Sequence, residues 1–543
     1  MSTLSFNITF EQPFLVGSGS SGDGLDLVSR PDQLLPSESL KGAMRAAALH
    51  ALSLDPKLLD QVFGSEGDVG NKVGASPWAW GEVDSSQGGF RRSSRSRNRV
   101  DHETGSTVPS ALAAMEVVYQ TGDNVSFEIE QVLPLNDATR QEHEVILQAC
   151  AYGVTALGQG RNRSMGTVSI RPSEPIKDPT GFAESLDKIT ATSSRGVPLT
   201  AAATKSVVAT TKKRYFLIRM KPGKTMRVGS GAASGFASPT LTYAPSTTLK
   251  GAMGTAWLTE NAKRTVGDLL PLLEATWVSD AVPVAEGSDW QPVVLPLDRS
   301  VCKYPVDACP PSHPSSVEKC SECGGKPEPS KGKRELPRGL ASAHPVTRVA
   351  LDERERARDE MLFQREVMSF EGCELVAFMA TTLQDEKGLV HEDEVVRVGG
   401  TRSIAGRAQI TGVTLLSDLD LPRLPPGSHG MRIELMGPGV FVDEFGFPSN
   451  QPSEEDLRHA LDLPEATLTV ERAFTRWGRV TGWNLAVNLP RTEDVSVIAH
   501  SVFHVRIDTN QEVKVPAIVN NLGLRTDEGC GWARIERIEE DHA

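Results

Sequence analysis

The sequence predicts an α+β protein in which helices cover one face of antiparallel sheets. Some segments alternate apolar and polar residues as strands do, namely 6–16, 214–221 and 501–508. Others place apolar residues at helical spacing, namely 40–52, 249–258 and 454–463. A chain of 543 residues is too long for one core, so we expect several units that each combine a sheet with one or two helices.

The overall charge limits the classes of partner. The chain has 57 Lys and Arg against 70 Asp and Glu, which gives a formal net charge of −13. This balance argues against a protein that coats nucleic acid indiscriminately, but it is compatible with a local cationic groove. No apolar stretch approaches the ~18 residues of a membrane span. The start, MSTLSFNITF, lacks the pattern of a secretory signal, so we expect a cytoplasmic protein with no membrane partner.

A repeated motif indicates that the chain contains related units. PSESLKGAM (36–44) returns as PSTTLKGAM (245–253), and each copy follows a Gly-Ser-Gly sequence. A second element mixes glycine with arginine and occurs three times, as GQGRNRSMG (158–166), GGTRSIAG (399–406) and GLRTDEGCG (523–531). The organisation that we expect is a first unit over 1–172, a linker over 173–212, a second unit over 213–412 and a third unit over 413–543.

The repeated helix motif suggests an anion site. Pro36 and Ser39 predict a helix start, with Ser39 as the N-cap and Lys41 in the first turn, and Thr248 and Lys250 take the matching positions in the second copy. A cation there opposes the helix macrodipole, at a cost of roughly 0.3–1 kcal/mol. The conflict disappears if the free N–H groups bind a phosphate. A surface lysine on an ordinary helix is the alternative, and the duplication argues against it.

Two further patterns are suited to phosphate. The glycine–arginine segments can expose backbone N–H groups, with Arg161 and Arg163 nearby, although a glycine-rich hairpin turn would have the same composition. Residues 89–100 hold five arginines that no acid interrupts, namely Arg91, Arg92, Arg95, Arg97 and Arg99. This basic stripe suits an RNA or DNA backbone, and a solvated loop is the alternative.

Four cysteines have the spacing of a metal site. Cys302, Cys309, Cys320 and Cys323 form a C-x6-C-x10-C-x2-C pattern, and Cys320–Cys323 with the following glycines is typical of a knuckle turn. Four thiolates make a closed tetrahedral zinc site, so the predicted Zn²⁺ is structural. His313 is a less favoured substitute for one ligand. Four free thiols in a proline-rich loop are the alternative.

Aspartates near the first helix motif are candidate catalytic acids. Asp23, Asp26 and Asp32 lie between Gly17 and Pro36, whereas the matching stretch of the second copy contains no acid. A carboxylate beside a phosphate site can bind a divalent metal or assist attack by a ribose 2′-hydroxyl. If the acid is catalytic, only the first unit cuts RNA. Turn-forming aspartates are the alternative.

Together these motifs resemble the RAMP superfamily of CRISPR effector proteins. The matching residues span nearly the whole chain: 36–45, 158–166, 245–254, 399–407 and 523–531. The resemblance implies tandem ferredoxin-like (RRM-like) domains, with guide CRISPR RNA, target RNA and other complex subunits as partners. It implies RNA contacts at Ser39, Lys41, Arg45, the arginines of the basic stripe, Gly160, Arg161, Arg163, Thr248, Lys250, Arg402, Arg407 and Arg525.

The units resemble different subunits of type III complexes. The first is similar to a backbone subunit, in which an aspartate before the helix motif cuts target RNA with Mg²⁺ or another divalent metal. Asp26 matches that position best, although Ser37-Glu38 stands where the family usually has Gly-Ser. The second and third resemble the two-domain tag-end subunit of type III-D systems, with a zinc insertion at about 296–340. There, Arg476, Trp477 and Trp483 are candidates for contacts with the guide.

The resulting hypothesis is a guide-RNA-binding subunit that also acts as an endoribonuclease on target RNA through Asp26. A non-catalytic RNA-binding scaffold of the same complex is the alternative, and the acid-free second copy is compatible with it. A guide-processing endonuclease ranks lower. Such enzymes often use a general-base histidine, and the 11 histidines form no cluster in the sequence.

Overall fold

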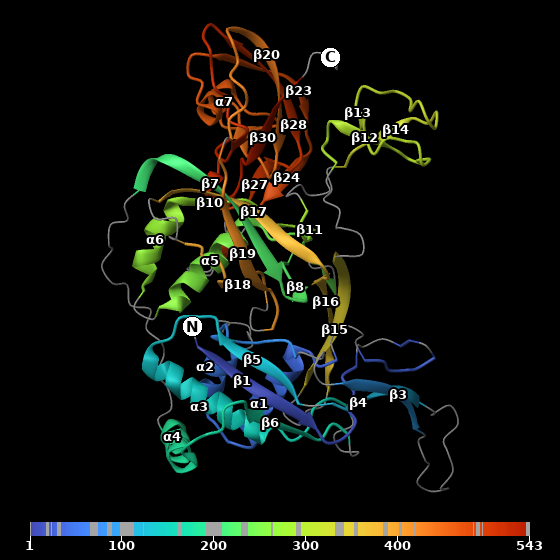
Figure 1. Cartoon of the computed structure of the whole chain (residues 1–543), viewed down its shortest axis with the longest axis vertical. Helices are drawn as coiled ribbons and strands as arrows, with labels where there is room; N and C mark the ends of the chain where they lie inside the picture. The colour runs from blue at the N-terminus through green and yellow to red at the C-terminus, as the bar shows by residue number, and fades with distance from the viewer. Residues whose placement is uncertain are drawn as a thin grey trace.

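The computed structural model arranges the chain as three bodies in a row, with the first unit at one end and the third at the other (Figure 1). It describes all residues except 1, 18–20, 23, 30–33, 66–73, 84–88, 98–112, 123, 160–164, 192–208, 230–236, 262–263, 289–294, 332–340, 352–356, 384–388, 401–403, 418, 482, 485–488, 491 and 539–543. Within this described part, none of the helices is both long and apolar enough to cross a bilayer.

The first unit contains a four-stranded antiparallel sheet in the order β2-β5-β1-β6. Its strands are β1 (Thr3–Phe10), β2 (Trp78–Trp80), β5 (Val125–Gln131) and β6 (Val168–Pro172). Its helices are α1 (Ser37–His50), α2 (Pro56–Phe63) and α3 (Asp137–Gly153). Successive side chains of β1 point to opposite faces of the sheet, so Phe6 and Ile8 lie on the same face. They are buried in a core that also contains Leu40 of α1 and Ile146 of α3. Helices therefore cover the sheet face that the sequence predicted to be apolar.

Helix α4 (Pro179–Ala191) lies inside the stretch expected to be a linker. It packs on α3 and buries Ile189 in the first core, with Leu186 partly buried beside it. The Ser-, Thr- and Ala-rich composition of 173–212 indicated a linker, although a few apolar residues within it have helical spacing. The proposed linker therefore begins with a helix that belongs to the first unit.

The second unit has a six-stranded antiparallel sheet around β7 (Ala209–Pro222). The main order is β10-β17-β7-β19-β18, and β11 also pairs with β17. The other strands are β10 (Thr276–Val278), β11 (Val282–Ala285), β17 (Cys373–Leu383), β18 (Val395–Arg397) and β19 (Arg407–Leu415). Helices α5 (Ser246–Glu260) and α6 (Val266–Glu274) bury Leu249, Met253 and Leu269 against the sheet. Strand β19 continues past residue 412, where the sequence predicted the unit to end.

Two smaller sheets belong to insertions in the second unit. The hairpin of β15 (Ala341–Leu351) and β16 (Ala357–Phe370) pairs with β8 (Thr225–Met226) and β9 (Ala237–Ser238). The cysteine-rich segment forms β12 (Arg299–Cys302), β13 (His313–Pro314) and β14 (Pro327–Pro329), in the order β13-β12-β14. Figure 1 shows this segment beside the third unit, away from helices α5 and α6.

The third unit has a five-stranded antiparallel sheet in the order β23-β28-β20-β30-β29. Its strands are β20 (Gly427–Leu435), β23 (Thr467–Phe474), β28 (Val502–Thr509), β29 (Ile518–Val519) and β30 (Ala533–Arg537). Helix α7 (Glu454–Leu461) starts at a capping box between Ser453 and Asp456 and buries Leu457 in the core. Short strand pairs lie beside the sheet: β21 (Phe441–Val442) with β22 (Pro448–Ser449), β24 (Trp477–Val480) with β27 (Asp494–Val497), and β25 (Trp483–Asn484) with β26 (Leu489–Pro490).

Different kinds of contact join the units. Between the first and second, Glu130 accepts hydrogen bonds from Arg397 at 2.7 Å and from Arg407 at 3.3 Å. Burial raises the pKa of Glu130, but the two guanidiniums outweigh it and hold that pKa below its usual value. Between the second and third, a buried apolar cluster includes Trp532 and Phe378. A charged contact thus joins the first and second units, and a buried apolar cluster contributes to the junction of the second and third units.

Candidate nucleic-acid interface and metal centre

The basic stripe forms a β-hairpin at the edge of the first unit. Strand β3 (Phe90–Arg97) pairs with β4 (Ala113–Gln120), and Figure 1 shows both strands extending from the body of the unit. The side chains of Arg91, Arg92 and Arg95 are exposed, and Arg92 lies 3.8 Å from Glu116. Only the backbone of Arg97 is described, and Arg99 lies outside the described residues. The hairpin therefore presents at least three cations to solvent.

Asp26 lies against this hairpin. Its backbone N–H donates to Ala114 O at 2.8 Å, and its Oδ2 accepts from Ala114 N at 2.8 Å. Ala114 faces Ser96, which lies between Arg95 and Arg97 on the paired strand. The Asp26 side chain is otherwise exposed. The structure thus brings the candidate acid to the arginine hairpin, a proximity that the sequence separation of the two motifs did not predict. Asp23 and Asp32 lie outside the described residues.

A small apolar cluster joins three of the sequence motifs. Met115 and Val117 come from β4, Leu27 follows Asp26, and Met165 is the next-to-last residue of the glycine–arginine segment; all of them pack with Leu15. Since these side chains share one cluster, the acid, the arginine hairpin and the glycine–arginine segment are held in one region of the first unit. The other predicted residues of that segment, Gly160, Arg161 and Arg163, lie outside the described residues.

All three glycine–arginine segments are closed in the same way. The first glycine of each segment has a positive φ, which is +87° at Gly158, +91° at Gly399 and +89° at Gly523. The last glycine of each also has a positive φ, which is +71° at Gly166, +80° at Gly406 and +73° at Gly531. In every copy, a Cβ on either glycine would lie 2.6 Å or less from a backbone carbonyl oxygen. The residue before the first glycine donates its N–H to the carbonyl of the last, at 2.8, 2.8 and 3.2 Å. Both glycines are therefore required by the backbone. Arg402 lies outside the described residues.

The two LKGAM helices begin earlier than the sequence predicted. Helix α1 starts at Ser37 after the extended Pro36, and α5 starts at Ser246 after Pro245. Proline fixes φ for the residue that precedes the helix, so the first turn begins directly after it. Ser39 and Thr248 therefore lie in the first turn, and the prediction that Ser39 is the N-cap is wrong. In neither helix does the N-cap residue itself, Pro36 or Pro245, supply a side-chain hydrogen bond.

Lys41 lies in the first unit over an aromatic ring. Its Nζ is 5.3 Å from the centre of the Trp80 ring. Burial, followed by repulsion from Arg45, lowers the pKa of Lys41 to about 8. Arg45 itself donates to Gly64 O at 2.6 Å and pairs with Asp60 at 2.9 Å. The predicted RNA contacts of both residues stay predictions, and protein groups also surround each of them.

Three other predicted RNA-binding residues have protein partners elsewhere. Arg407 pairs with Glu130 of the first unit. Lys250 Nζ donates to Asp527 O at 3.2 Å, which links the second and third units. Arg525 is largely buried and forms ion pairs with Asp494 and Glu528. These positions make contacts within the protein that motif spacing alone did not indicate.

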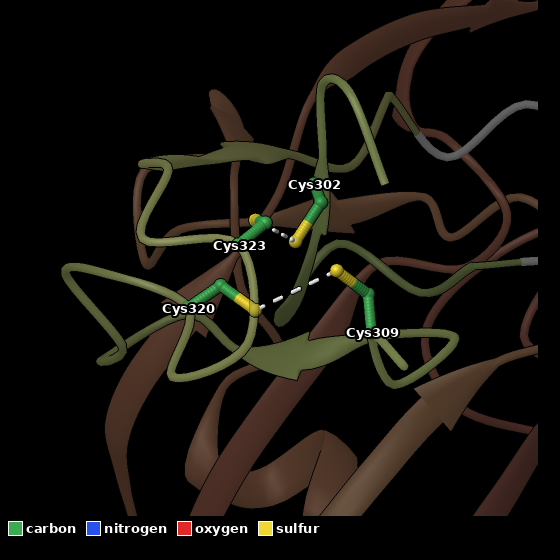
Figure 2. A group of neighbouring side chains, drawn as sticks. All are labelled: Cys302, Cys309, Cys320 and Cys323. Carbon is green, nitrogen blue, oxygen red and sulfur yellow. Dashed lines mark hydrogen bonds between the residues drawn. The ribbon is translucent and has the colours of Figure 1, made fainter. Parts of the chain in front are cut away.

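The four predicted metal ligands converge. Figure 2 shows the Cys302, Cys309, Cys320 and Cys323 side chains directed toward one another. Their four sulfurs lie within 4.8 Å of one another, with 3.6 Å between Cys302 and Cys323 and 3.8 Å between Cys309 and Cys320. Tetrahedral zinc with Zn–S bonds of about 2.3 Å separates its sulfurs by about 3.8 Å, so this group could hold such a metal. Hydrogen bonding to backbone N–H groups, chiefly that of Cys323, lowers the pKa of Cys320 to about 6 and favours its thiolate.

His313 lies next to the cysteines. Its Nε2 is 3.2 Å from the Cys302 sulfur, and its side chain is buried. The grouping of candidate ligands in the described residues contains the four cysteines without it. The geometry therefore favours His313 as a hydrogen-bonding neighbour of a ligand, a common role for polar groups around metal sites.

A buried charged cluster anchors the cysteine-rich segment to the third unit. Arg432 of β20 donates to both oxygens of Asp298, at 2.6 and 3.0 Å, and to Glu434 at 3.0 Å. His500 Nδ1 lies 3.1 Å from Glu434. Burial alone would raise the pKa of Asp298, but hydrogen bonds from His504 and Arg432 lower it below its usual range. No local sequence pattern indicates this cluster, because Asp298 lies 134 residues from Arg432 and His500 lies 66 residues from Glu434.

The candidate guide-binding aromatics are partly described. Trp477 on β24 is 56% exposed, while its cross-strand partner Val497 is buried. Arg476 donates to Lys331 O at 3.0 Å. For Trp483 only the backbone is described. Trp477 is thus available for stacking on a base, and Arg476 has a contact next to the cysteine-rich segment.

Comparison with known proteins gives limited likeness. No protein-family model and no curated protein match this sequence. Two similar solved structures are chains of a type III-B Cmr-beta complex, one bound to cognate target RNA and AMPPnP and one bound to cognate target RNA. They are 12% and 14% identical, with TM-scores of 0.33 and 0.30, and each match covers 53% of this chain and 86% of the other. These values are too low for either structure to assign a function to this chain.

Proposed function

We propose that this chain is a guide-RNA-binding subunit of a type III CRISPR complex and that its first unit cleaves target RNA at Asp26. The observation that carries this proposal is the apolar cluster of Leu15, Leu27, Met115, Val117 and Met165. It gathers an exposed carboxylate, an arginine hairpin and a glycine-closed loop, each of which has a sequence motif suited to RNA. Such a grouping suits a phosphate backbone next to an acid.

The topology of the first unit supports the proposed ferredoxin-like fold. Its main elements follow the order strand, helix, strand, strand, helix, strand, with α2 and the arginine hairpin as additions. The four strands form one antiparallel sheet with the first strand, β1, in its interior. This βαββαβ arrangement is that of ferredoxin-like domains. We extend the proposal to the other units because their glycine–arginine segments close in the same way.

In the proposed reaction, the Asp26 carboxylate lies beside the scissile phosphate. Its Oδ2 is oriented by the Ala114 N–H, which leaves Oδ1 for the substrate side. A carboxylate there can take the proton of a 2′-hydroxyl as its oxygen bonds to the adjacent phosphorus; the bond from phosphorus to the 5′-oxygen breaks, and the 5′-oxygen takes a proton from water. A bound Mg²⁺ would supply charge stabilisation at the phosphate oxygens. The exposed Arg91, Arg92 and Arg95 would hold the strand through its phosphates.

A non-catalytic scaffold remains the second candidate, and one observation favours it. Among the described residues, the only group of ligating side chains close enough to hold a metal is the cysteine cluster. Asp26 therefore belongs to no described group of three or more ligating side chains, and the described residues do not support two-metal catalysis. In this alternative, Asp26 only fastens its loop to the Ala114 backbone.

The test uses the intact complex assembled with guide RNA and a complementary target. We expect Asp26→Ala and Asp26→Asn to preserve assembly and guide binding, and to slow cutting at one position by about 100-fold or more. Asp137→Asn, an exposed aspartate in the first turn of α3, is the matched control and should cut normally. Unchanged cutting by both Asp26 variants would favour the scaffold.

For the metal centre, we propose structural Zn²⁺. Four cysteine thiolates leave no coordination position for a substrate, so the site has no part in the proposed cleavage. The donor set is soft, which suits zinc better than Mg²⁺ or Ca²⁺. The metal would fix β12 and the two turns that carry the cysteines.

A further inference from the structure

A carboxylate of the protein itself already lies at the N-terminus of helix α5. Ser246 N, the first N–H of the helix, donates to Asp280 Oδ1 at 3.0 Å, and Asp280 is only 8% exposed. A carboxylate at this end is favourable because it interacts with the positive end of the helix dipole. The charge that a phosphate would bring to this copy of the LKGAM motif is therefore supplied by the protein itself.

The third glycine–arginine segment, which we call loop 523–531, covers this helix start. Gly529 has φ of +87°, and a Cβ at this position would lie 2.1 Å from the Cβ of Ser246 and 3.1 Å from Val278 O. Two residues earlier, Asp527 O accepts a hydrogen bond from Lys250 Nζ. The backbone of the loop thus lies directly against the N-terminus of α5, so close that only a glycine fits at position 529.

The same loop holds a hairpin of the third unit through Arg525. Its Nη1 donates to Val480 O at 3.2 Å, to Thr492 O at 3.1 Å and to Asp494 at 2.8 Å. These three acceptors lie at or next to the ends of β24 and β27, the strand pair that carries Trp477. An isolated two-stranded hairpin is marginal in water, so charge-assisted bonds from a largely buried arginine contribute to its position.

We propose that loop 523–531 is a structural crosspiece that fixes the Trp477 hairpin relative to helix α5. Lys250 and Arg525 are then positioning residues and not phosphate ligands. The two copies of the LKGAM motif then have different roles. The first lies in the proposed RNA-binding unit, and the second binds loop 523–531 of the same chain. The effect on RNA rests on the proposed function, whereas the crosspiece itself does not.

The first test measures hydrogen exchange of the full chain without RNA. We expect Gly529→Ala to speed exchange at the first turn of α5 and in β24 and β27 by about tenfold or more, because the added Cβ displaces the loop. Gly446→Ala is the matched control. Gly446 also has positive φ, at +81°, but its Cβ would meet nothing within 4 Å. Equal exchange in these segments for both variants would overturn the crosspiece.

The second test compares the two motif lysines at pH 7 by the salt dependence of guide RNA binding. A lost phosphate contact lowers the slope of log affinity against log salt by about one, which is our expectation for Lys41→Met. We expect Lys250→Met to leave this slope unchanged and to speed exchange at the start of α5. A slope loss in Lys250→Met equal to that in Lys41→Met, without faster exchange, would overturn the proposal. If the native chain binds no guide RNA, the proposed function fails, and the exchange test still decides on the crosspiece.

Discussion

At the scale of single residues, burial sets the chemistry of His143 in the first unit. The side chain is 2% exposed, and its Nδ1 accepts a hydrogen bond from Trp78 Nε1 at 3.1 Å. Its Nε2 is buried and has no hydrogen-bond partner among the described residues. Burial lowers the pKa of His143 to about 4, so the folded protein keeps the ring neutral where an unfolded chain would protonate it.

This histidine should make the first unit sensitive to acid. The unfolded chain binds a proton near pH 6.5 and the folded unit only near pH 4, so stability is fully present above pH 6.5 and is lost as pH falls toward 4. Between pH 7.5 and 5 the loss is about 2 kcal/mol. Hydrogen exchange of the β1 and β5 amides at several pH values measures it. We expect His143→Gln to reduce this pH dependence, and an identical dependence in the variant would contradict the assignment.

The sequence predicted which nearby residues group together better than it predicted which distant residues would contact them. The four cysteines are grouped as their spacing indicated, because all of them lie within one short stretch of the chain, residues 302–323. The neighbours of Arg407 and Lys250 come from 277 residues away in each case, so no local pattern could indicate Glu130 or Asp527 as partners. The RNA contacts at these two positions were expected from the repeated motifs and from the resemblance, and they stay predictions.

At the scale of elements, the cysteine-rich segment would depend on the proposed metal and on its anchor to the third unit. Its three strands are two to four residues long, too short to form a stable sheet alone. Asp298, just before β12, fastens it to Arg432 of the third unit. The buried ion pair, together with the proposed metal, would thus take the place of the apolar core that so small a segment lacks.

Metal removal should therefore unfold this segment alone. We expect the purified chain to carry about one zinc ion, measured by elemental analysis, and to lose it in Cys302→Ser/Cys323→Ser. Hydrogen exchange should then rise in β12–β14 and stay unchanged in the first unit. Cys373→Ala removes a cysteine outside the cluster and should keep the metal. A segment that stays protected without metal would contradict this account.

The sequence predicted helices and strands correctly where the spacing of their apolar residues was regular. The predicted helices over 40–52 and 249–258 exist, but each begins at the serine that follows proline, three residues earlier. Helix α4 was missed because small polar residues surround its few apolar positions. The sequence of the basic stripe is compatible both with a solvated loop and with a surface that binds a nucleic-acid backbone. Pairing with β4, which its own sequence does not reveal, makes it a hairpin.

At the scale of the whole molecule, three glycine-closed segments repeat along one chain but have different neighbours. The first shares an apolar cluster with the proposed catalytic region, the second leads into Arg407 and the first unit, and the third covers α5. The sequence revealed the repetition because glycines with positive φ cannot be replaced without strain. It could not reveal the neighbours, since packing between units depends on surfaces formed only after each unit folds.

The measurement that tests the central claim most directly is the salt dependence of guide RNA binding by the full chain. We predict that affinity falls steeply between roughly 50 and 200 mM salt, as expected when several phosphates are contacted. Arg91→Ala/Arg92→Ala/Arg95→Ala should lower the slope by about two to three. Arg423→Ala/Arg506→Ala, which removes exposed ion-paired arginines from the third unit, should not change it. A flat salt response, or a slope that the hairpin variant leaves unchanged, would contradict the account.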